Sequence, residues 1–397
     1  MRIVFLCTSG LDNASPRGRW LPLACELARL GHEPHLVLLH PTFDVMPVGE
    51  RDFVQDGVHI MHVAQMHVYG LPGARRYFGT GELVRVSRHA AETLAHHALA
   101  LRPDVLHICK PQPINGLAGW WAARRLDRPF FVDCDDFEAE ANRTTNLAQR
   151  TLIRWCEDTL PRHASGITVN THFLLNRYQA LGVDVHRIVH VPNGADPAPV
   201  DIRALPTTIR NLVGQPVVLY VGTLSTLAHG VDLLIDAFAH VRRRVSGATL
   251  VMVGDGDDRG MLHAHASQLG LGEAVHWVGR VAPDDAQHYF GVARCSVDPV
   301  RDIPGARGRS PLKIVESLAA GVPVVTSDVG DRRAMLGDGG AGVLVRPGDA
   351  AALADGLVRV LTDDGLHQTL AAGALAERER YGWRALSRRW LGIYDVT

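Results

Sequence analysis

The chain repeats one order of elements at the start of each half: a short apolar run, a small-residue loop and an amphipathic helix. In the first half, the apolar run covers residues 2–7, and apolar residues then recur at helical spacing over 21–30. In the second half, the run covers 216–221 and the helix is predicted over 231–244. Strands that alternate with helices form parallel sheets with helices on both faces. The chain is therefore predicted to be α/β, with two Rossmann-like, doubly wound domains.

Further apolar runs predict the remaining strands, at 34–39, 104–109, 129–133, 166–170, 249–253, 276–278, 296–298, 322–326 and 342–345. Prolines and an Asn-Gly pair cluster over 191–215, which marks a domain boundary. We expect a first domain over 1–195 and a second over 196–379. Two such domains that face one another would hold a ligand in the cleft between the carboxyl ends of their strands.

The charge and the cysteine content limit the functions and locations that the protein is expected to have. Lys and Arg number 41 and Asp and Glu 42, so no global charge would attract nucleic acid or anionic lipid. The six cysteines lie far apart with no CxxC spacing, which favours free thiols in a reducing compartment. No apolar run is long enough to span a bilayer, and the first run does not resemble a signal peptide. We expect a cytoplasmic protein, and a basic, apolar helix over 83–101 leaves a weak peripheral membrane contact open.

The densest cluster of chemically useful residues follows position 309. Ser310 is suited to cap a helix that begins with Pro311, and Lys313 and Glu316 would then share one helix face. A helix N-terminus with a lysine is a natural seat for a phosphate, and Glu316 would accept hydrogen bonds from the two hydroxyls of a ribose. The alternative is a surface Lys–Glu pair on an amphipathic helix.

Several motifs, in order along the chain, resemble those of the retaining glycosyltransferase family 4, the glycosyl transferases group 1. They are Val191–Asp196, Leu219–Leu224, Gly230–Ile235, Val251–Gly256, Glu316–Val325 and Gly342–Asp349. The resemblance implies the glycosyltransferase-B fold, with the acceptor on the first domain and the nucleotide sugar on the second. It also implies that residues 380–397 cross back onto the first domain. The implied activity is that of a hexosyltransferase, which moves a sugar from a UDP- or GDP-sugar to an acceptor hydroxyl with retention of anomeric configuration, without a cofactor or a required metal.

Three positions depart from the family pattern: Gly308 replaces a glutamate, Thr223 an arginine and His229 a lysine. Either the donor site has decayed or its positive charge has moved, and we favour a move to Lys313. The main-chain amides of residues 222–224 would also line a diphosphate. The predicted donor-binding residues are Gly222, Thr223, His229, Gly230, Arg307, Ser310, Lys313 and Glu316.

The first domain offers fewer signals. His107 matches the first histidine of the family's Asp-x-x-His strand end, which makes it a catalytic candidate with Lys313 and Glu316, although it would equally be a core histidine. Lys110 follows the same strand, and Asp135 and Asp136 follow the next. These carboxylates would bind acceptor hydroxyls or amines, or cap a helix over 137–141; a metal held by Asp133 and Asp135 is a weaker alternative.

Arg17, with Arg19, would bind a phosphate on either substrate or begin a solvated helix. The predicted acceptor-binding residues are Arg17, Lys110, Asp135 and Asp136. Two other functions stay open: a nucleotide-sugar epimerase or hydrolase on the same fold, and a non-catalytic binding homologue. The sequence names neither the sugar, the base nor the acceptor.

Overall fold

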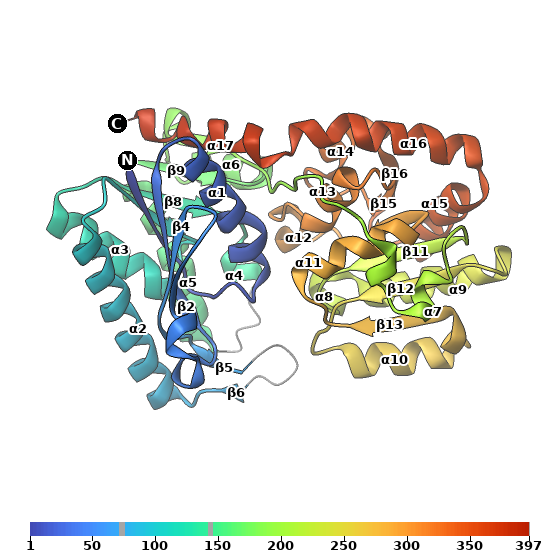
Figure 1. Cartoon of the computed structure of the whole chain (residues 1–397), viewed down its shortest axis with the longest axis horizontal. Helices are drawn as coiled ribbons and strands as arrows, with labels where there is room; N and C mark the ends of the chain where they lie inside the picture. Colours follow the sequence, from blue (N-terminus) through green and yellow to red (C-terminus); the bar gives the residue numbers. More distant parts are fainter. Residues whose placement is uncertain (71–75, 142–145, 397) are drawn as a thin grey trace. The chain divides into compact units, whose positions relative to one another are not determined.

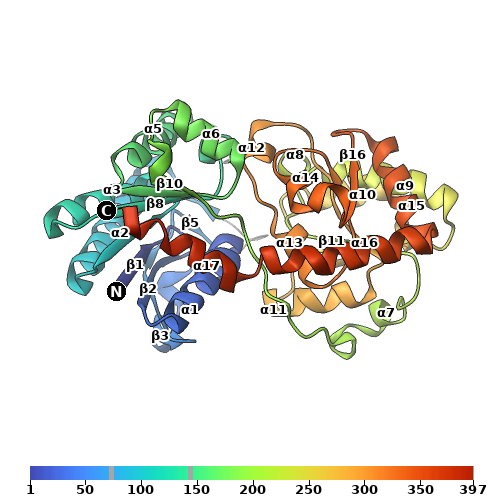
Figure 2. The same cartoon turned by 90° about the horizontal axis from the view of Figure 1, so that it is seen from above.

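The computed structural model describes residues 1–70, 76–141 and 146–396, and it divides into two compact units. Unit 1 contains residues 1–193, 308–310 and 383–397, and unit 2 contains 194–307 and 311–382. Figures 1 and 2 show each unit as a sheet flanked by helices.

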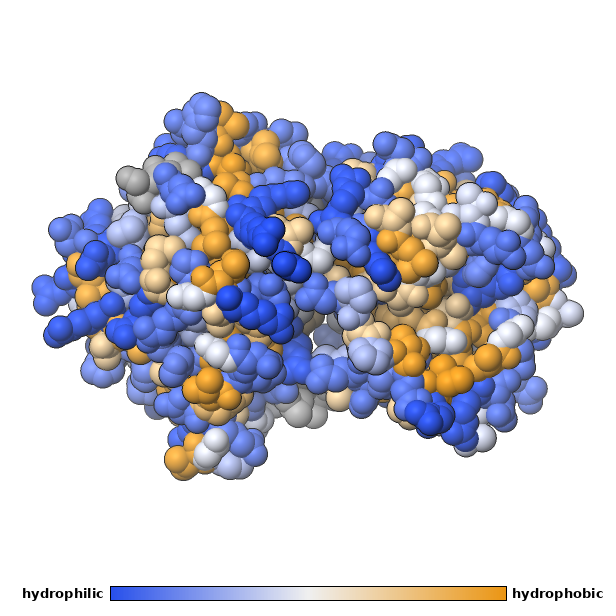
Figure 3. Space-filling view, turned by 45° about the horizontal axis from the view of Figure 1, so that its top comes forward, coloured by the Kyte–Doolittle hydropathy of each residue, from blue (hydrophilic) through white to orange (hydrophobic). Residues whose placement is uncertain are grey.

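On the face shown in Figure 3, hydrophobic side chains reach the surface of each unit in patches that hydrophilic side chains separate. Among the described helices, none combines the length and hydrophobicity that crossing a bilayer requires.

The described strands of unit 1 form an eight-stranded sheet in the order β10-β9-β8-β7-β1-β2-β4-β3. These strands are β1 (Arg2–Leu6), β2 (Glu33–His40), β3 (Asp52–Gln55), β4 (Val58–Gln65), β7 (Val105–Cys109), β8 (Phe130–Cys134), β9 (Gly166–Val169) and β10 (Ile188–His190). Strand β3 runs antiparallel to β4, and the other described pairs are parallel. A separate antiparallel pair consists of β5 (Val68–Tyr69) and β6 (Arg76–Tyr77). The chain winds outward from β1 in both directions, so β1 and β7 meet at the switch point of the sheet.

Helices cover both faces of this sheet. Its helices are α1 (Leu21–Arg29), α2 (Thr80–Leu101), α3 (Pro113–Leu126), α4 (Glu138–Ala141), α5 (Leu147–His163), α6 (His172–Ala180) and α17 (Trp383–Leu391). Helices α2, α3, α5 and α6 share one buried cluster with one face, and α1 and α17 share another with the opposite face. Because β1 and β7 are buried on both faces, they read in the sequence as continuous apolar runs.

Unit 2 repeats this architecture with a six-stranded parallel sheet in the order β13-β12-β11-β14-β15-β16. Its strands are β11 (Val217–Val221), β12 (Thr249–Val253), β13 (Val275–Gly279), β14 (Cys295–Asp298), β15 (Val324–Ser327) and β16 (Gly342–Val345). Its helices are α7 (Thr207–Arg210), α8 (Thr226–His229), α9 (Val231–Arg244), α10 (Arg259–Gln268), α11 (Pro283–Ala286), α12 (Pro304–Arg307), α13 (Leu312–Ala319), α14 (Arg332–Met335), α15 (Ala350–Thr362) and α16 (Asp364–Glu377). Each unit thus has the doubly wound α/β architecture that the sequence predicts.

The last helix, α17, belongs to unit 1 although unit 2 precedes it in the chain. Its indoles Trp383 and Trp390 are buried at 2% and 0% exposure, in the cluster that contains Phe5 and Phe131. The Trp390 Nε1–H donates a hydrogen bond of 2.9 Å to the Tyr394 hydroxyl. The end of the chain therefore closes one face of the first sheet.

Candidate functional site

In unit 2, two glycine loops meet at the carboxyl ends of the central strands. Gly222 follows β11 with φ +146°, and Gly254 follows β12 with φ +136°. A Cβ atom on Gly254 would lie 1.9 Å from the Gly222 carbonyl oxygen, so the two loops are packed backbone against backbone. This is the sheet edge at which doubly wound proteins bind ligands.

In the loop after β11, two main-chain amides donate hydrogen bonds to carbonyls at the end of β12 and in the loop that follows it. The Gly222 N–H donates to the Val253 carbonyl at 2.9 Å, and the Leu224 N–H donates to the Asp255 carbonyl at 3.1 Å. The Thr223 side chain is exposed, and its carbonyl accepts from the Tyr220 hydroxyl at 2.7 Å. The prediction that the amides of residues 222–224 line a diphosphate is therefore wrong for Gly222 and Leu224.

Lys313 projects from α13 to the first loop. Its Nζ lies 3.0 Å from Asp298 Oδ1 and 5.1 Å from the centre of the Tyr220 ring, and a Cβ atom on Gly222 would be 3.6 Å from it. Arg332 Nε donates to the other oxygen of Asp298 at 2.7 Å. Burial opposes ionisation of Asp298, but Lys313 and Arg332 outweigh it and hold its pKa well below the usual range. Two buried cations thus share one carboxylate, so the group of Lys313, Arg332 and Asp298 carries a net positive charge.

The predicted N-cap of α13 is wrong. Helix α13 begins at Leu312, after Pro311 in an extended conformation, and it has no side-chain cap. Ser310 is instead held by Asn193 of unit 1: its Oγ accepts from the Asn193 N–H at 3.1 Å, and its carbonyl accepts from Asn193 Nδ2 at 2.7 Å. These contacts over a long sequence separation override the local capping preference.

Glu316 lies one turn after Lys313 and is half-buried. Burial raises the pKa of its carboxyl, and Lys313 partly opposes this effect. Among the described residues, no group donates a hydrogen bond to the Glu316 carboxylate. It therefore remains available to a ligand's hydroxyls.

Of three other predicted donor residues, Gly230 and Arg307 make contacts within unit 2. Gly230 joins α8 to α9 with φ +58°, and a Cβ there would lie 2.6 Å from the Pro299 carbonyl oxygen. His229 is the last residue of α8 and is half-buried. Arg307 forms a two-point ion pair with Asp302, at 2.6 and 2.8 Å. Donor contacts from His229 and Arg307 remain predictions.

In unit 1, Lys110 is the centre of a charged cluster at the ends of β7 and β8. Its Nζ lies 3.1 Å from Asp135, 2.7 Å from Asp136 and 2.9 Å from Glu138. Arg309 Nε is 3.7 Å from Asp136. The three carboxylates are close enough to share a metal ion, but the Lys110 ammonium already lies among them. The structure thus places Lys110, Asp135 and Asp136 in one network of ion pairs with Glu138 and Arg309, and their binding of an acceptor stays a prediction.

The capping alternative for Asp135 and Asp136 is wrong. Helix α4 begins at Glu138, and its first amides, of Glu138 and Ala139, donate to the two oxygens of Glu157 at 2.8 and 3.3 Å. Glu157 lies on α5 and is buried, with a pKa raised by burial to about 7.

Asp133 is a structural residue and does not bind metal. Its oxygens accept from Arg19 Nε and Nη2, each at 2.8 Å, from Trp20 Nε1 at 2.7 Å and from Thr168 Oγ1 at 2.8 Å. Arg19 is 1% exposed, so the proposal that it binds phosphate is also wrong. Arg17 is half-buried in the π-helical turn Pro16–Trp20, and its acceptor contact stays a prediction.

The catalytic assignment of His107 is contradicted, and the core alternative is correct. The residue is 0% exposed, and its ring lies 4.7 Å from that of Trp390 and 5.5 Å from that of Phe5. Burial lowers the pKa of His107 to about 3. Its Nδ1 lies 3.2 Å from the Tyr394 hydroxyl. A wholly enclosed, neutral ring under α17 cannot contact a substrate.

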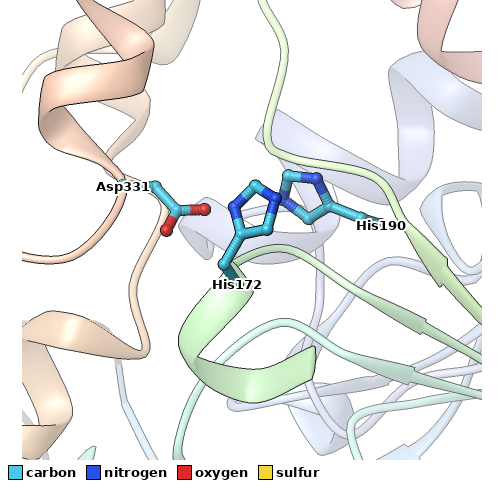
Figure 4. A group of neighbouring side chains, drawn as sticks. All are labelled: His172, His190 and Asp331. Atoms are coloured by element: carbon cyan, nitrogen blue, oxygen red, sulfur yellow. The ribbon is translucent and has the colours of Figure 1, made fainter. Parts of the chain in front are cut away.

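The structure also brings together two histidines of unit 1 that the sequence did not single out. His172, at the start of α6, and His190, at the end of β10, have ring centres 4.3 Å apart (Figure 4). His190 Nε2 lies 3.3 Å from the Asn170 carbonyl oxygen. The pairing of β10 with β9 brings them together. Two imidazoles alone do not make a zinc site, which needs three or four ligands.

Asp135 gives the unit 1 cluster a pH dependence. Burial raises the pKa of Asp135 to about 7, Lys110 opposes this shift, and Asp136 adds to it. Between pH 4 and 7, folded Asp135 therefore keeps a proton that the unfolded chain releases, and the free energy of unfolding falls as pH rises. We expect Asp135→Asn to raise the melting temperature by about 2–4 °C at pH 8, about 1 kcal/mol, and by clearly less at pH 5, which lies near the start of this pH range.

Differential scanning fluorimetry at the two pH values measures this effect. Asp52→Asn, on an exposed position of β3, is the control and should change neither melting temperature. A gain for Asp135→Asn that is equal at pH 5 and pH 8 would contradict the raised pKa.

Comparisons with known sequences match both units. The family described as Glycosyl transferase 4-like domain matches residues 17–194, and Glycosyl transferases group 1 matches residues 215–363. The phosphatidyl-myo-inositol mannosyltransferase of Mycobacterium leprae is 34% identical over 304 residues, 74% of each chain. That of Mycolicibacterium smegmatis is 32% identical, over 100% of this chain and 94% of the relative. The D-inositol 3-phosphate glycosyltransferase of Xylanimonas cellulosilytica is 30% identical, over 94% and 89%.

Solved structures are similar over the full chain. Sucrose-phosphate synthase from Thermosynechococcus elongatus has a TM-score of 0.77 at 20% identity, and the alignment covers 100% of this chain and 98% of that one. Anabaena HepE in complex with UDP-glucose has a TM-score of 0.74 at 20% identity and full coverage of both chains.

Proposed function

The chain belongs to the glycosyl transferases of group 1, and we propose from this membership that unit 2 binds its donor through Lys313 and Glu316. The enzyme is a retaining glycosyltransferase with a nucleotide sugar as donor, and the predicted family and glycosyltransferase-B fold class are confirmed.

The observation that carries the donor proposal is the group formed by Lys313, Asp298 and Arg332 beside Gly222. Breaking the bond between the sugar and the diphosphate develops negative charge on the leaving phosphate. Fixed positive charge in a buried site stabilises that charge in the transition state. Asp298 holds Lys313 of α13 in place before the donor binds. Lys313 would thus supply the positive charge that Thr223 and His229 do not provide.

Glu316 supports the nucleoside part of the same proposal. Its carboxylate has no donor among the described residues, and burial makes an unpaired charge costly. Two ribose hydroxyls would satisfy both oxygens. Ser310 contributes by holding Asn193 and is not itself assigned to the phosphate.

For the acceptor, we propose a hydroxyl on a polyol ring, because the curated relatives are named for inositol derivatives. Unit 1 would bind it near the ends of β1, β2, β7 and β8, where Arg17, Lys110, Asp135 and Asp136 remain candidates. The structures of Anabaena HepE contain UDP or UDP-glucose, which supports a UDP-sugar donor, and a GDP-sugar stays the other candidate.

A thermal-shift panel of UDP, GDP and their sugars tests the donor site. A ligand that binds only the folded state at 100 times its dissociation constant adds about 2.7 kcal/mol to the free energy of unfolding. We expect one nucleotide to raise the melting temperature without added magnesium. Glu316→Ala should weaken that nucleotide at least 10-fold, about 1.4 kcal/mol, because two charge-assisted hydrogen bonds are lost.

Glu273→Ala, an exposed glutamate of unit 2, is the matched control and should retain the wild-type shift. Equal affinity in wild type and Glu316→Ala would contradict the ribose contact. Nucleotide release from the sugar without any acceptor would favour the epimerase or hydrolase, and no shift with any nucleotide would favour the non-catalytic homologue.

A further inference from the structure

Arg332 is a buried arginine at the start of α14, and it is not among the predicted donor-binding residues. It is 1% exposed, and its Nε donates to Asp298 Oδ2 at 2.7 Å. Its Nη1 donates to the carbonyls of Ala306 and Val329, at 3.0 and 3.1 Å. Among the described residues, its Nη2 has no partner, and no second carboxylate forms an ion pair with the guanidinium. Arg332 is thus enclosed within unit 2 and does not itself contact a substrate.

The carboxylate of Asp298 is shared between Arg332 and Lys313. Asp298 ends β14, which lies between β11 and β15 in the sheet, and its Oδ1 is 3.0 Å from Lys313 Nζ. Burial opposes its ionisation, but Lys313 and Arg332 hold its pKa well below the usual range, so the carboxylate is charged at neutral pH. Without Arg332, Lys313 and Asp298 would form a neutral pair. With Arg332, one positive charge remains in the group.

A surplus charge inside a protein is costly unless another charge compensates it. Even a matched buried ion pair repays only part of the free energy that its two charges lose on leaving water. A neutral side chain in place of Arg332 would leave Lys313 and Asp298 matched, so the second cation adds a cost that folding does not require. Glu316, one turn further along α13, forms an ion pair with neither cation among the described residues. An anion bound beside Lys313, such as the diphosphate of the donor, would compensate the surplus.

We propose that Arg332 is a positioning residue for the transfer reaction: it binds Asp298, so that the charge of Lys313 remains effective toward the diphosphate of the donor. This inference rests on the proposed donor site. Arg332 acts without contact, because charges in a protein interior interact more strongly than in water. The alternative is that Arg332 only fastens the segments that contain Ala306 and Val329.

Arg332→Met removes the charge and keeps an unbranched side chain, while Lys313 still pairs with Asp298. The probes are the nucleoside diphosphate that the thermal-shift panel identifies and the nucleoside without phosphates. We expect the variant to bind the diphosphate at least 10-fold more weakly, about 1.4 kcal/mol, and the nucleoside as wild type does. Isothermal titration calorimetry measures the dissociation constant of the diphosphate, and displacement titrations measure that of the nucleoside. Equal weakening of both ligands, or unchanged binding of the diphosphate, would overturn the proposal.

Asp298→Asn, added to Arg332→Met, separates the charge from the loop contacts. The double variant lacks both the guanidinium and the carboxylate, so Lys313 alone gives the group one positive charge, and the new amide keeps an oxygen beside Lys313 Nζ. We expect it to recover most of the lost affinity for the diphosphate, although the carbonyls of Ala306 and Val329 still lack Arg332. A double variant that binds the diphosphate no better than Arg332→Met would refute the role of the charge.

Arg333→Met is the matched control. Arg333 is the next residue of α14 and pairs with Asp328, but its side chain is 53% exposed. Its removal should change neither affinity, because exposed ion pairs contribute little. Melting temperatures of the same samples show which variants fold. If Arg332→Met does not fold, the double variant decides: a wild-type preference for the diphosphate over the nucleoside supports the proposal, and a preference at least 10-fold weaker, about 1.4 kcal/mol, overturns it.

The outcome for the wild type separates this inference from the donor site on which it rests. A wild-type protein that binds no nucleotide contradicts the donor site and this inference together. A wild-type protein that binds the diphosphate, with the same preference in Arg332→Met, overturns only the role of Arg332.

Discussion

Lys313→Gln is expected to lower kcat/KM for sugar transfer by about 100-fold to 1,000-fold, the usual effect of removing one preorganised group that stabilises transition-state charge. The glutamine amide keeps a donor near Asp298 but carries no charge. Arg332 remains 2.7 Å from the same carboxylate, so the buried Asp298 keeps a cationic partner and the fold should survive. Steady-state kinetics with the nucleotide sugar identified by thermal shift would measure the loss.

Arg301→Ala is the matched control for this experiment. Arg301 belongs to the same unit and is also positively charged, but it forms a two-point ion pair with Asp232 at 3.0 and 2.7 Å and is 42% exposed. Its loss should change kcat/KM only a few-fold, because exposed ion pairs contribute little. Equal losses in Lys313→Gln and Arg301→Ala would show that the missing positive charge has not moved to Lys313.

Arg19→Met is expected to destabilise the protein by about 3–5 kcal/mol, because it leaves the buried Asp133 carboxylate without its cation. Arg19 is 1% exposed, contacts both oxygens of Asp133 and also donates to the Val191 carbonyl and Asn193 Oδ1, each at 3.0 Å. Denaturant unfolding monitored by tryptophan fluorescence would measure the change in the free energy of unfolding.

Two further variants test whether the lost stability comes from the buried ion pair or from the removal of an arginine in general. Arg88→Met removes a side chain that is 79% exposed and paired with Glu92, itself 60% exposed, and it should cost less than about 1 kcal/mol. Adding Asp133→Asn to Arg19→Met should recover part of the lost stability, since no unpaired charge then remains. A double variant less stable than Arg19→Met alone would refute the explanation.

The parts of the structure that depend on local pattern followed from the sequence. Buried strands such as β11 and β12 have continuous apolar runs, and α9 has an apolar stripe at helical spacing, so their residue types alone identify them. Lys313 and Glu316 were found because they lie three apart on one helix, where spacing implies proximity.

Contacts between distant segments were the parts that sequence reasoning missed or mistook. Arg19 and Asp133 are 114 residues apart, and no periodicity relates them. Ser310 is a residue type that often caps helices, but Asn193, from a distant segment, donates hydrogen bonds to its hydroxyl and carbonyl oxygens. Asp298 could have been noticed in the sequence, because it is a carboxylate at the carboxyl end of a predicted strand. Its two cationic partners could not, because they lie 15 and 34 residues further along the chain.

Helix α17 imposes an order on biogenesis. Its tryptophans complete the aromatic cluster around Phe5, Phe131 and His107, but they leave the ribosome only after all of unit 2. At about 5–20 residues per second, synthesis of that unit takes about 10–40 s. For that interval, the part of this sheet face that α17 covers, beside α1, is an exposed apolar surface on a nascent chain. Unit 1 is thus the first unit to be translated and the last to be completed. Chaperones that bind exposed aromatic surface can act on it while unit 2 is synthesised.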